Sequence, residues 1–119
     1  MTQQSIGLGG TATTVDLRSS SLATFGTDAR RVSGATAWLW SGNVLLDDKL
    51  AYTGEGNDRD PILAVIGGTV PTATVTGYLS ADVDMDGVVR YTGADNDRDP
   101  ILSNIGGTTP TNVRIQQLP

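Results

Sequence analysis

The chain lacks cysteine and histidine altogether, and aromatic side chains make up only 5% of its 119 residues. These absences exclude disulfide bonds, zinc sites built from Cys and His, thiol nucleophiles and Ser-His-Asp catalytic triads. With so few aromatic residues, a chain of this length buries limited apolar surface and forms one small domain or two very small ones. Any metal ion that it binds must be held by oxygen atoms.

Basic residues and long apolar runs are also scarce. Eight Lys and Arg against thirteen Asp and Glu give a net charge of -5, which argues against nucleic acid and anionic lipid as partners. No run approaches the roughly 18 apolar residues of a membrane-spanning helix, and the N-terminus has no basic or apolar leader. We therefore expect no membrane insertion. A signal peptide would have to lie upstream of Met1, which need not be the natural start.

A duplication dominates the rest of the sequence. Residues 40–74 and 79–113 align with an offset of 39, the difference between Tyr91 and Tyr52, and are identical at 19 of 35 positions. Two copies are fewer than the roughly three repeats that a stacked solenoid needs, so we expect a paired unit in which one copy packs on the other. The predicted organisation is an N-terminal β segment, residues 1–38, which ends or links a preceding β domain, and a duplicated unit, residues 39–119.

Each copy predicts a short helix that starts near the shared motif NDRDPIL and stops at Gly-Gly. Proline favours the first helical position, so Asp60 and Asp99, which precede the prolines, are the expected N-caps. An apolar face follows at helical spacing, formed by Ile62, Leu63 and Ile66 in the first copy and by Ile101, Leu102 and Ile105 in the second. Because such short helices are unstable alone, each must pack against its twin.

The N-terminal third has a different character. Residues 11–17 and 35–40 predict strands around a polar, turn-rich middle. Trp38 and Trp40 would share one face of the second strand, in the core or at an interface, with an aromatic ligand platform as the remote alternative. The first strand, which carries Val15 and Leu17, would leave a free edge for pairing with another chain.

The second copy contains an acidic loop with the sequence D-V-D-M-D-G. Carboxylates at positions 1, 3 and 5 and glycine at position 6 match the first half of an EF-hand calcium loop. Alternate residues of a tightly curved loop point inward, so Asp82, Asp84 and Asp86 can converge on one cation, while Gly87 permits the turn. The backbone carbonyl of Val88 is a further expected ligand. Three ionised carboxylates in one turn repel each other, and oxygen ligands in a flexible loop favour Ca²⁺ as the ion that offsets them.

The ligand that closes this loop lies outside the twelve-residue pattern, because Gly93 occupies position 12, where an EF-hand has a bidentate carboxylate. Asp97 is the expected closing ligand, and Asp99 is the competitor if it is not simply the N-cap. Asp95 is expected in solvent. The competing interpretation is that these aspartates are all solvated turn residues and helix caps.

The matching loop of the first copy, N-V-L-L-D-D, is degenerate. It keeps oxygen donors at positions 1 and 5 but has Leu45 at position 3 and Asp48 at position 6. A second, weaker metal site would use four partial ligands: Asn43, Asp47, Asp58 and Asp60. The alternative is a hydrogen-bonded loop that needs no ion. Arg59 and Arg98 lie between aspartates in both copies, and we expect them to pair with carboxylates across the two repeats.

Residues 82–107 resemble the dockerin-like duplicated calcium module found at the extreme C-terminus of large secreted bacterial surface proteins. The segments F-G-T-D-A-R-R, W-S-G-N and R-I-Q-Q-L-P also resemble that family, so the resemblance covers nearly the whole chain. It implies calcium held by Asp82, Asp84 and Asp86, an extracellular setting after adhesive or immunoglobulin-like domains, and no catalytic activity. The chain departs from true dockerins at Gly93 and in its shorter helix.

These observations predict a mixed, loop-rich fold in which N-terminal β-strands precede a duplicated unit of calcium loop and short helix. We expect a non-catalytic, extracellular or cell-surface module that calcium stabilises and that mediates protein–protein association. The alternative is a protomer of an extracellular filament that polymerises through residues 11–17 by β-augmentation. A carbohydrate-active enzyme fragment is the remote alternative, since the carboxylates are committed to the ion loop and little chain is left to build a substrate pocket.

Overall fold

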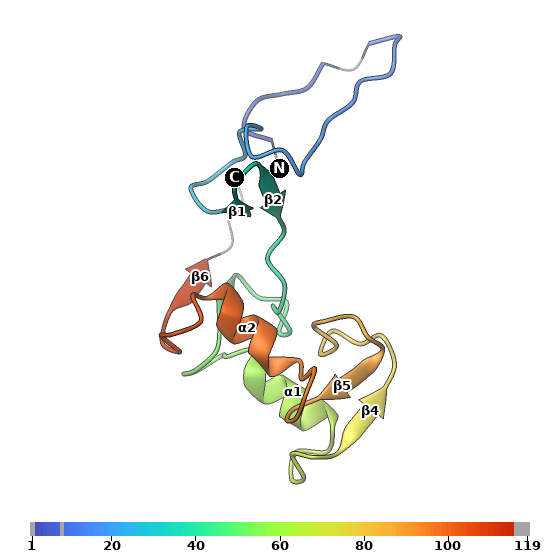
Figure 1. Ribbon diagram of the computed structural model, residues 1–119, viewed down its shortest axis with the longest axis vertical. Helices are drawn as coiled ribbons and strands as arrows, with labels where there is room; N and C mark the ends of the chain where they lie inside the picture. Colours follow the sequence, from blue (N-terminus) through green and yellow to red (C-terminus); the bar gives the residue numbers. More distant parts are fainter. Residues whose placement is uncertain (1, 8, 116–119) are drawn as a thin grey trace. The chain divides into compact units, whose positions relative to one another are not determined.

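The computed structural model describes residues 2–7 and 9–115 (Figure 1). The chain divides into two compact units, with the boundary between Trp40 and Ser41. Regular structure is sparse: the described residues form six strands of three residues and two helices of seven. The mixed, loop-rich fold that the sequence predicts is confirmed. No helix among the described residues is long and apolar enough to cross a membrane.

The N-terminal unit is built around one antiparallel hairpin, β1 (Arg31–Ser33) and β2 (Thr36–Trp38). A preceding segment lies along the other edge of β2, where the Ser20 N–H donates to the Ala35 carbonyl at 3.0 Å. The guanidinium of Arg30 donates to backbone carbonyls of the same segment, including that of Ser19 at 3.1 Å. This arginine therefore ties a loop that has few apolar side chains to bury.

One strand prediction in this unit is wrong, and the other is confirmed only in part. Residues 11–17 form no strand, and the strand expected at 35–40 is reduced to β2. A strand requires a neighbouring segment to take its backbone hydrogen bonds, and within the described residues none pairs with 11–17. Val15 and Leu17 are exposed, and 56% of the surface of Trp38 is accessible to solvent. Trp40 lies beyond the strand and donates its indole N–H to the Asp28 carbonyl at 2.8 Å, so the two tryptophans share no strand face.

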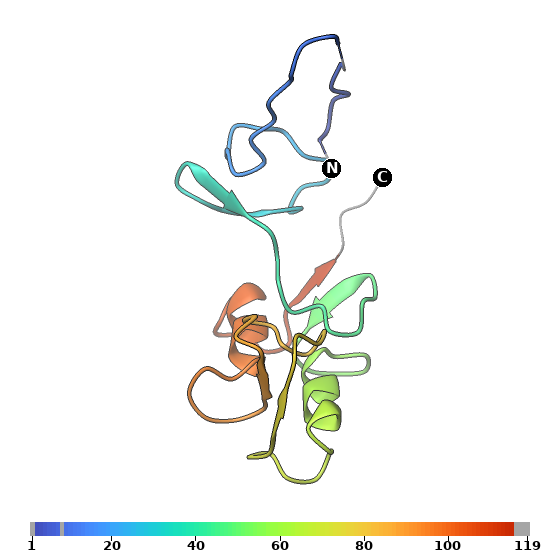
Figure 2. The same ribbon diagram turned by 90° about the vertical axis from the view of Figure 1, so that its right-hand side faces the viewer.

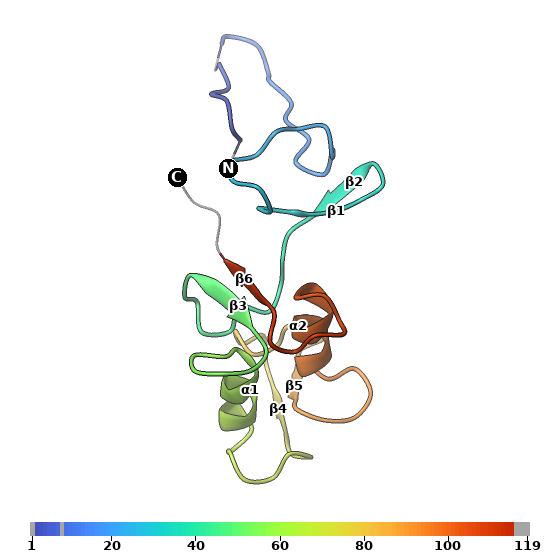
Figure 3. The ribbon, with the colours of Figure 1, turned by 90° about the vertical axis from the view of Figure 1, so that its left-hand side faces the viewer.

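The second unit contains two small sheets, and each joins one copy of the repeat to the other (Figures 2 and 3). The strand β3 (Lys49–Ala51) of the first copy pairs with β6 (Val113–Ile115) of the second, and β4 (Thr74–Thr76) of the first pairs with β5 (Val88–Arg90) of the second. Both pairs are antiparallel and have equivalent registers, Ala51 opposite Val113 and Thr74 opposite Arg90. Each copy therefore supplies the strand that the other copy lacks.

Two threonine side chains repeat this reciprocal exchange outside the sheets. The Thr53 hydroxyl of the first copy donates to the Pro110 carbonyl of the second at 2.9 Å. Its counterpart Thr92 donates to the Pro71 carbonyl of the first copy at the same distance. Both bonds connect the turn after one copy's strand to the loop that precedes the other copy's last strand.

The helices α1 (Arg59–Val65) and α2 (Arg98–Asn104) begin earlier than the sequence predicts. Their N-caps are Asp58 and Asp97, whereas the predicted caps Asp60 and Asp99 lie inside the first turn. The side chain of the preceding asparagine makes the capping hydrogen bonds, because the side-chain Oδ1 of Asn57 accepts the Asp60 N–H at 3.0 Å. The side-chain amide of Asn57 in turn donates to the Asp60 carboxylate at 2.8 Å. This reciprocal pair of hydrogen bonds resembles a capping box.

Both helices end at the Gly-Gly pair, as predicted. In α1 the Gly68 N–H donates to the Leu63 carbonyl at 2.8 Å and the Gly67 N–H to the Ala64 carbonyl at 3.0 Å. Both glycines have positive φ, 105° at Gly67 and 77° at Gly68. This pattern is the Schellman motif, which satisfies the last carbonyls of the helix and requires a left-handed residue after it. The bonds from Gly106 and Gly107 are equivalent in α2.

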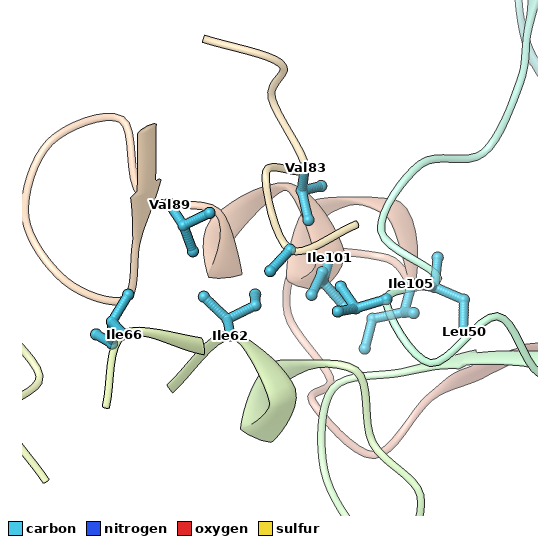
Figure 4. Close-up of a cluster of buried hydrophobic side chains, with 9 residues drawn as sticks. Leu50, Ile62, Ile66, Val83, Val89, Ile101 and Ile105 are labelled. Atoms are coloured by element: carbon cyan, nitrogen blue, oxygen red, sulfur yellow. The ribbon is translucent and has the colours of Figure 1, made fainter. Parts of the chain in front are cut away.

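Both copies contribute to a single apolar core (Figure 4). Ile62 of α1 and Ile101 of α2 occupy equivalent positions and are fully buried. They pack with Val83, from the acidic loop, and Val89, from β5; the remaining buried members are Val44, Leu50, Ile66, Ala81 and Ile105. The two helices therefore share one core, as expected for helices too short to be stable alone.

Candidate metal centre

The acidic loop of the second copy brings three carboxylates together. Asp82, Asp84 and Asp86 each offer an oxygen, and these oxygens all lie within 4.8 Å of one another. Met85 and Gly87, at the tip, both have positive φ, 62° and 86°, which turns the chain sharply so that the alternate aspartates face one centre. This is the convergence that the 1, 3, 5 spacing predicts, and the group could hold a metal ion.

Backbone hydrogen bonds hold the loop in this shape. The Asp84 carboxylate accepts the Asp86 N–H at 3.1 Å, and the Asp86 carboxylate accepts the Val88 N–H at 2.7 Å. Asp82 spans the loop, since its Oδ2 accepts the Gly87 N–H at 3.0 Å. Each aspartate thus has one oxygen engaged with the backbone of its own loop, an arrangement that orients the carboxylates before any ion binds.

The other oxygen of Asp82 is the clearest sign of a ligand. Asp82 is only 6% exposed, and its Oδ1 is buried without a hydrogen-bond partner. An unpartnered buried oxygen of a carboxylate is costly, because its interaction with water is lost and not replaced. A cation at the centre of the three carboxylates would supply the missing interaction.

The pKa shifts of the loop reflect its concentration of negative charge. Partial removal from water raises the pKa of Asp84, and the negative charges of nearby carboxylates raise it further, those of Asp86, Asp97 and Asp82. Asp86 is different, because the Arg90 guanidinium donates a hydrogen bond to it and lowers its pKa. Most of the loop's charge is left for another cation to offset.

Asp97, the predicted closing ligand, is held by backbone hydrogen bonds. Its side chain is fully buried and accepts three backbone N–H groups: Val83 at 2.6 Å and Asp84 at 3.4 Å on one oxygen, and Arg90 at 2.7 Å on the other. It is not a member of the three-carboxylate group. These bonds engage both oxygens of the Asp97 carboxylate. Asp97, the N-cap of α2, therefore connects the start of this helix to the acidic loop and to β5.

Two other predicted ligands of this copy, Asp99 and the Val88 carbonyl, and the exposed Asp95 have neighbours of their own. Asp99 belongs to the first turn of α2, where the Asn96 amide donates to its carboxylate at 2.9 Å. Asp95 is exposed and outside the group, as is consistent with a position in solvent. The Val88 carbonyl faces Arg90, whose Nη1 lies 3.5 Å away.

The first copy does not gather its four predicted ligands. The Asn43 amide donates to the Asp47 carbonyl at 2.7 Å, and the Asn43 oxygen accepts the Asp47 N–H at 3.1 Å, so this side chain closes the loop by itself. Asp58 is buried under three backbone N–H groups, and Asp60 lies on α1. Among the described residues, the only three-carboxylate group is that of the second copy. The alternative prediction for the first copy, a hydrogen-bonded loop that needs no ion, fits these contacts.

The prediction that Arg59 and Arg98 pair across the repeats is also wrong. The Arg59 guanidinium lies 5.3 Å from the centre of the Tyr52 ring and binds the neighbouring Asp60 at 3.1 Å. Arg98 is arranged in the same way over Tyr91, at 5.1 Å. Each arginine therefore contacts the next aspartate in the sequence and a tyrosine of its own copy, and not a carboxylate of the other copy. The sequence analysis did not predict the capping role of Asn57 and Asn96 or the contact of Arg90 with Asp86. The pattern N-x-x-D, present in both copies, is a capping signal that could have indicated the two asparagines.

Comparisons with protein-family models, with curated proteins and with solved structures find no match for this chain.

Proposed function

We propose that this chain is a non-catalytic calcium-binding module of an extracellular or cell-surface protein, in which the ion stabilises a unit used for protein–protein association. The observation that supports it most directly is the buried, unpartnered Oδ1 of Asp82 inside a group of three convergent carboxylates. The resemblance to dockerin-like modules supports the setting and the type of partner.

The donor set favours calcium among the common cations. Every available ligand is an oxygen, and the loop offers carboxylates together with a backbone carbonyl, which hard cations prefer. Asp84 and Asp86 are exposed enough to adjust their positions and to leave room for water. Ca²⁺ accepts irregular coordination by six to eight oxygens, whereas Mg²⁺ demands a near-ideal octahedron.

Ion binding at this loop would act on the whole second unit. The loop leads directly into β5, which pairs with β4 of the other copy, and Val83 of the loop is a member of the shared core. A ligand that binds only the folded form stabilises that form by mass action. We therefore expect calcium to rigidify both copies and not merely the loop that holds it.

The alternatives are less well supported. Filament assembly was argued from a strand at residues 11–17, and that strand is not formed. A glycosidase-like site needs two carboxylates across a cleft, whereas the clustered aspartates of this chain lie within a single six-residue loop.

Titration of the chelator-treated protein with Ca²⁺, followed by calorimetry and thermal denaturation, tests the proposal. A hundredfold excess over the dissociation constant should stabilise the fold by about 2.7 kcal/mol. Asp84→Asn should remove most of this gain. Asp95→Asn, which makes the same change of charge outside the group, should keep it. Identical melting curves in chelator and in millimolar calcium, or equal losses in both variants, would overturn the proposal.

A further inference from the structure

Arg90, the last residue of β5, contacts the acidic loop through its side chain. Its Nη1 donates a hydrogen bond to Oδ2 of Asp86 and lies 3.5 Å from the Val88 carbonyl. These are the groups at positions 5 and 7 of the loop, both expected as ligands. The guanidinium thus contacts two of the oxygens that a bound cation would need, in a copy whose position 12 holds Gly93 and no carboxylate.

The first copy shows that the fold does not require an arginine here. Ala51 is the equivalent residue, and its N–H donates to Asp58 at 2.9 Å just as the Arg90 N–H donates to Asp97 at 2.7 Å. Both residues end a strand that pairs with the other copy. The backbone N–H makes the same hydrogen bond whether the side chain is alanine or arginine. The guanidinium of Arg90 therefore serves the acidic loop, which only the second copy has.

The negative charges around Arg90 include two carboxylates of the three-carboxylate group, those of Asp84 and Asp86. Arg90 donates a hydrogen bond to Asp86, and the charges of Asp86, Asp84 and Asp95 also act on its guanidinium. The side chain is 28% exposed, against 35% for Asp86, so the pair is only partly screened by water. Arg90 therefore offsets part of the repulsion among the aspartates when the protein holds no ion.

We infer that Arg90 is a tethered cation that competes with calcium for Asp86 and the Val88 carbonyl, and so sets the affinity of the site. This inference rests on the proposed calcium function. Without an ion, Arg90 keeps the loop in its folded shape. When calcium binds, the guanidinium has to withdraw from Asp86 or share it with a second cation, and either event weakens binding, because like charges repel.

The test compares Arg90→Ala, which copies the residue of the first repeat, with the wild-type protein. Calorimetric titration with CaCl₂ gives the dissociation constant, and thermal denaturation in chelator gives the stability of the ion-free form. Arg90→Ala should bind calcium more tightly, on the order of tenfold for the loss of one adjacent like charge, and should melt at a lower temperature in chelator. Raising the salt concentration should narrow the difference in affinity, because salt screens the competing charge.

Three further variants separate the local effect of Arg90 from a general change of net charge and from a failure to fold. Arg18→Ala makes the same change of net charge in the N-terminal unit, where Arg18 pairs with Asp16, and should leave both measurements unchanged. Arg90→Gln repeats the test with a longer side chain if Arg90→Ala does not fold. Arg90→Lys, which keeps the charge, should bind calcium nearly as weakly as the wild type does, unlike Arg90→Ala and Arg90→Gln.

The outcomes distinguish this inference from the proposed function. If the wild-type protein binds calcium and Arg90→Ala and Arg90→Gln bind it no more tightly than Arg18→Ala, the role of Arg90 is overturned and the calcium site stands. If neither the wild type nor any Arg90 variant binds the ion at millimolar concentration, both are overturned. Binding by the Arg90 variants alone would support both the site and the competition.

Discussion

Asp58 and Asp97, 39 residues apart, each place a fully buried carboxylate under three backbone N–H groups of their own copy. Asp58 accepts those of Val44, Leu45 and Ala51, and Asp97 accepts the three equivalent ones. Each carboxylate thereby joins a loop, a strand and the start of a helix. Burial raises the pKa of Asp58, although its hydrogen bonds act in the opposite direction.

The first prediction concerns these two aspartates. Asp97→Asn and Asp58→Asn should each destabilise the fold by about 1–3 kcal/mol, because an amide nitrogen would replace an acceptor that faces a backbone donor. Urea denaturation in chelator measures the loss, with Asp95→Asn as the exposed control. If Asp97→Asn instead kept the stability of the ion-free protein and abolished calcium binding, Asp97 would be a ligand after all.

The second prediction concerns the exchange of strands between copies. Residues 41–76 and 79–115, prepared separately, should show no cooperative unfolding, because each strand of one fragment has its partner in the other. An equimolar mixture in calcium should recover a cooperative transition by circular dichroism, because it restores both sheets and the shared core. A single fragment that unfolds cooperatively as a monomer would contradict the dependence of one copy on the other.

The third prediction is a pH dependence at the start of α1. The pKa of Asp60 lies below its ordinary value of 3.8, chiefly because the Asn57 amide donates to it and further because Arg59 does. A carboxylate with a lowered pKa in the folded state stabilises the fold above the unfolded-state pKa, and this contribution is lost as the pH falls through the folded-state value.

Asp60→Ala should therefore melt at a lower temperature than wild type at neutral pH, and the difference should shrink as the pH falls below 3.8. Thermal denaturation across this range is the measurement. A difference in melting temperature that is as large in strong acid as at neutral pH would mean that the ionised carboxylate is not the source.

The fourth prediction tests the helix ends. Gly68 and Gly107 have φ of 77° and 79°, and an added Cβ would have no heavy atom within 4 Å at either position. Gly68→Ala and Gly107→Ala should therefore cost about 1–2 kcal/mol through backbone conformation alone. Gly10→Ala, at another open position, is the control in the same denaturation experiment. Equal stability of all three variants would show that the left-handed conformation is not required.

Several features followed from the sequence because they depend on residues a few positions apart. The 1, 3, 5 spacing places Asp82, Asp84 and Asp86 together through the curvature of their own loop. The Gly-Gly pairs end both helices because a left-handed residue is needed directly after a helix. The apolar faces led by Ile62 and Ile101 follow from helical periodicity. The duplication itself was visible as an offset, without any knowledge of the fold.

Tertiary structure decided the features that depend on distant partners. Whether residues 11–17 formed a strand depended on a neighbouring segment, and β4 found its partner in the other copy and not in its own. The sequence predicts Asp97 as a ligand, but the folded chain brings three N–H groups to its buried carboxylate from residues 83, 84 and 90. Local spacing fixes which oxygens can converge; the long-range packing of backbone donors determines which of them stay available to an ion.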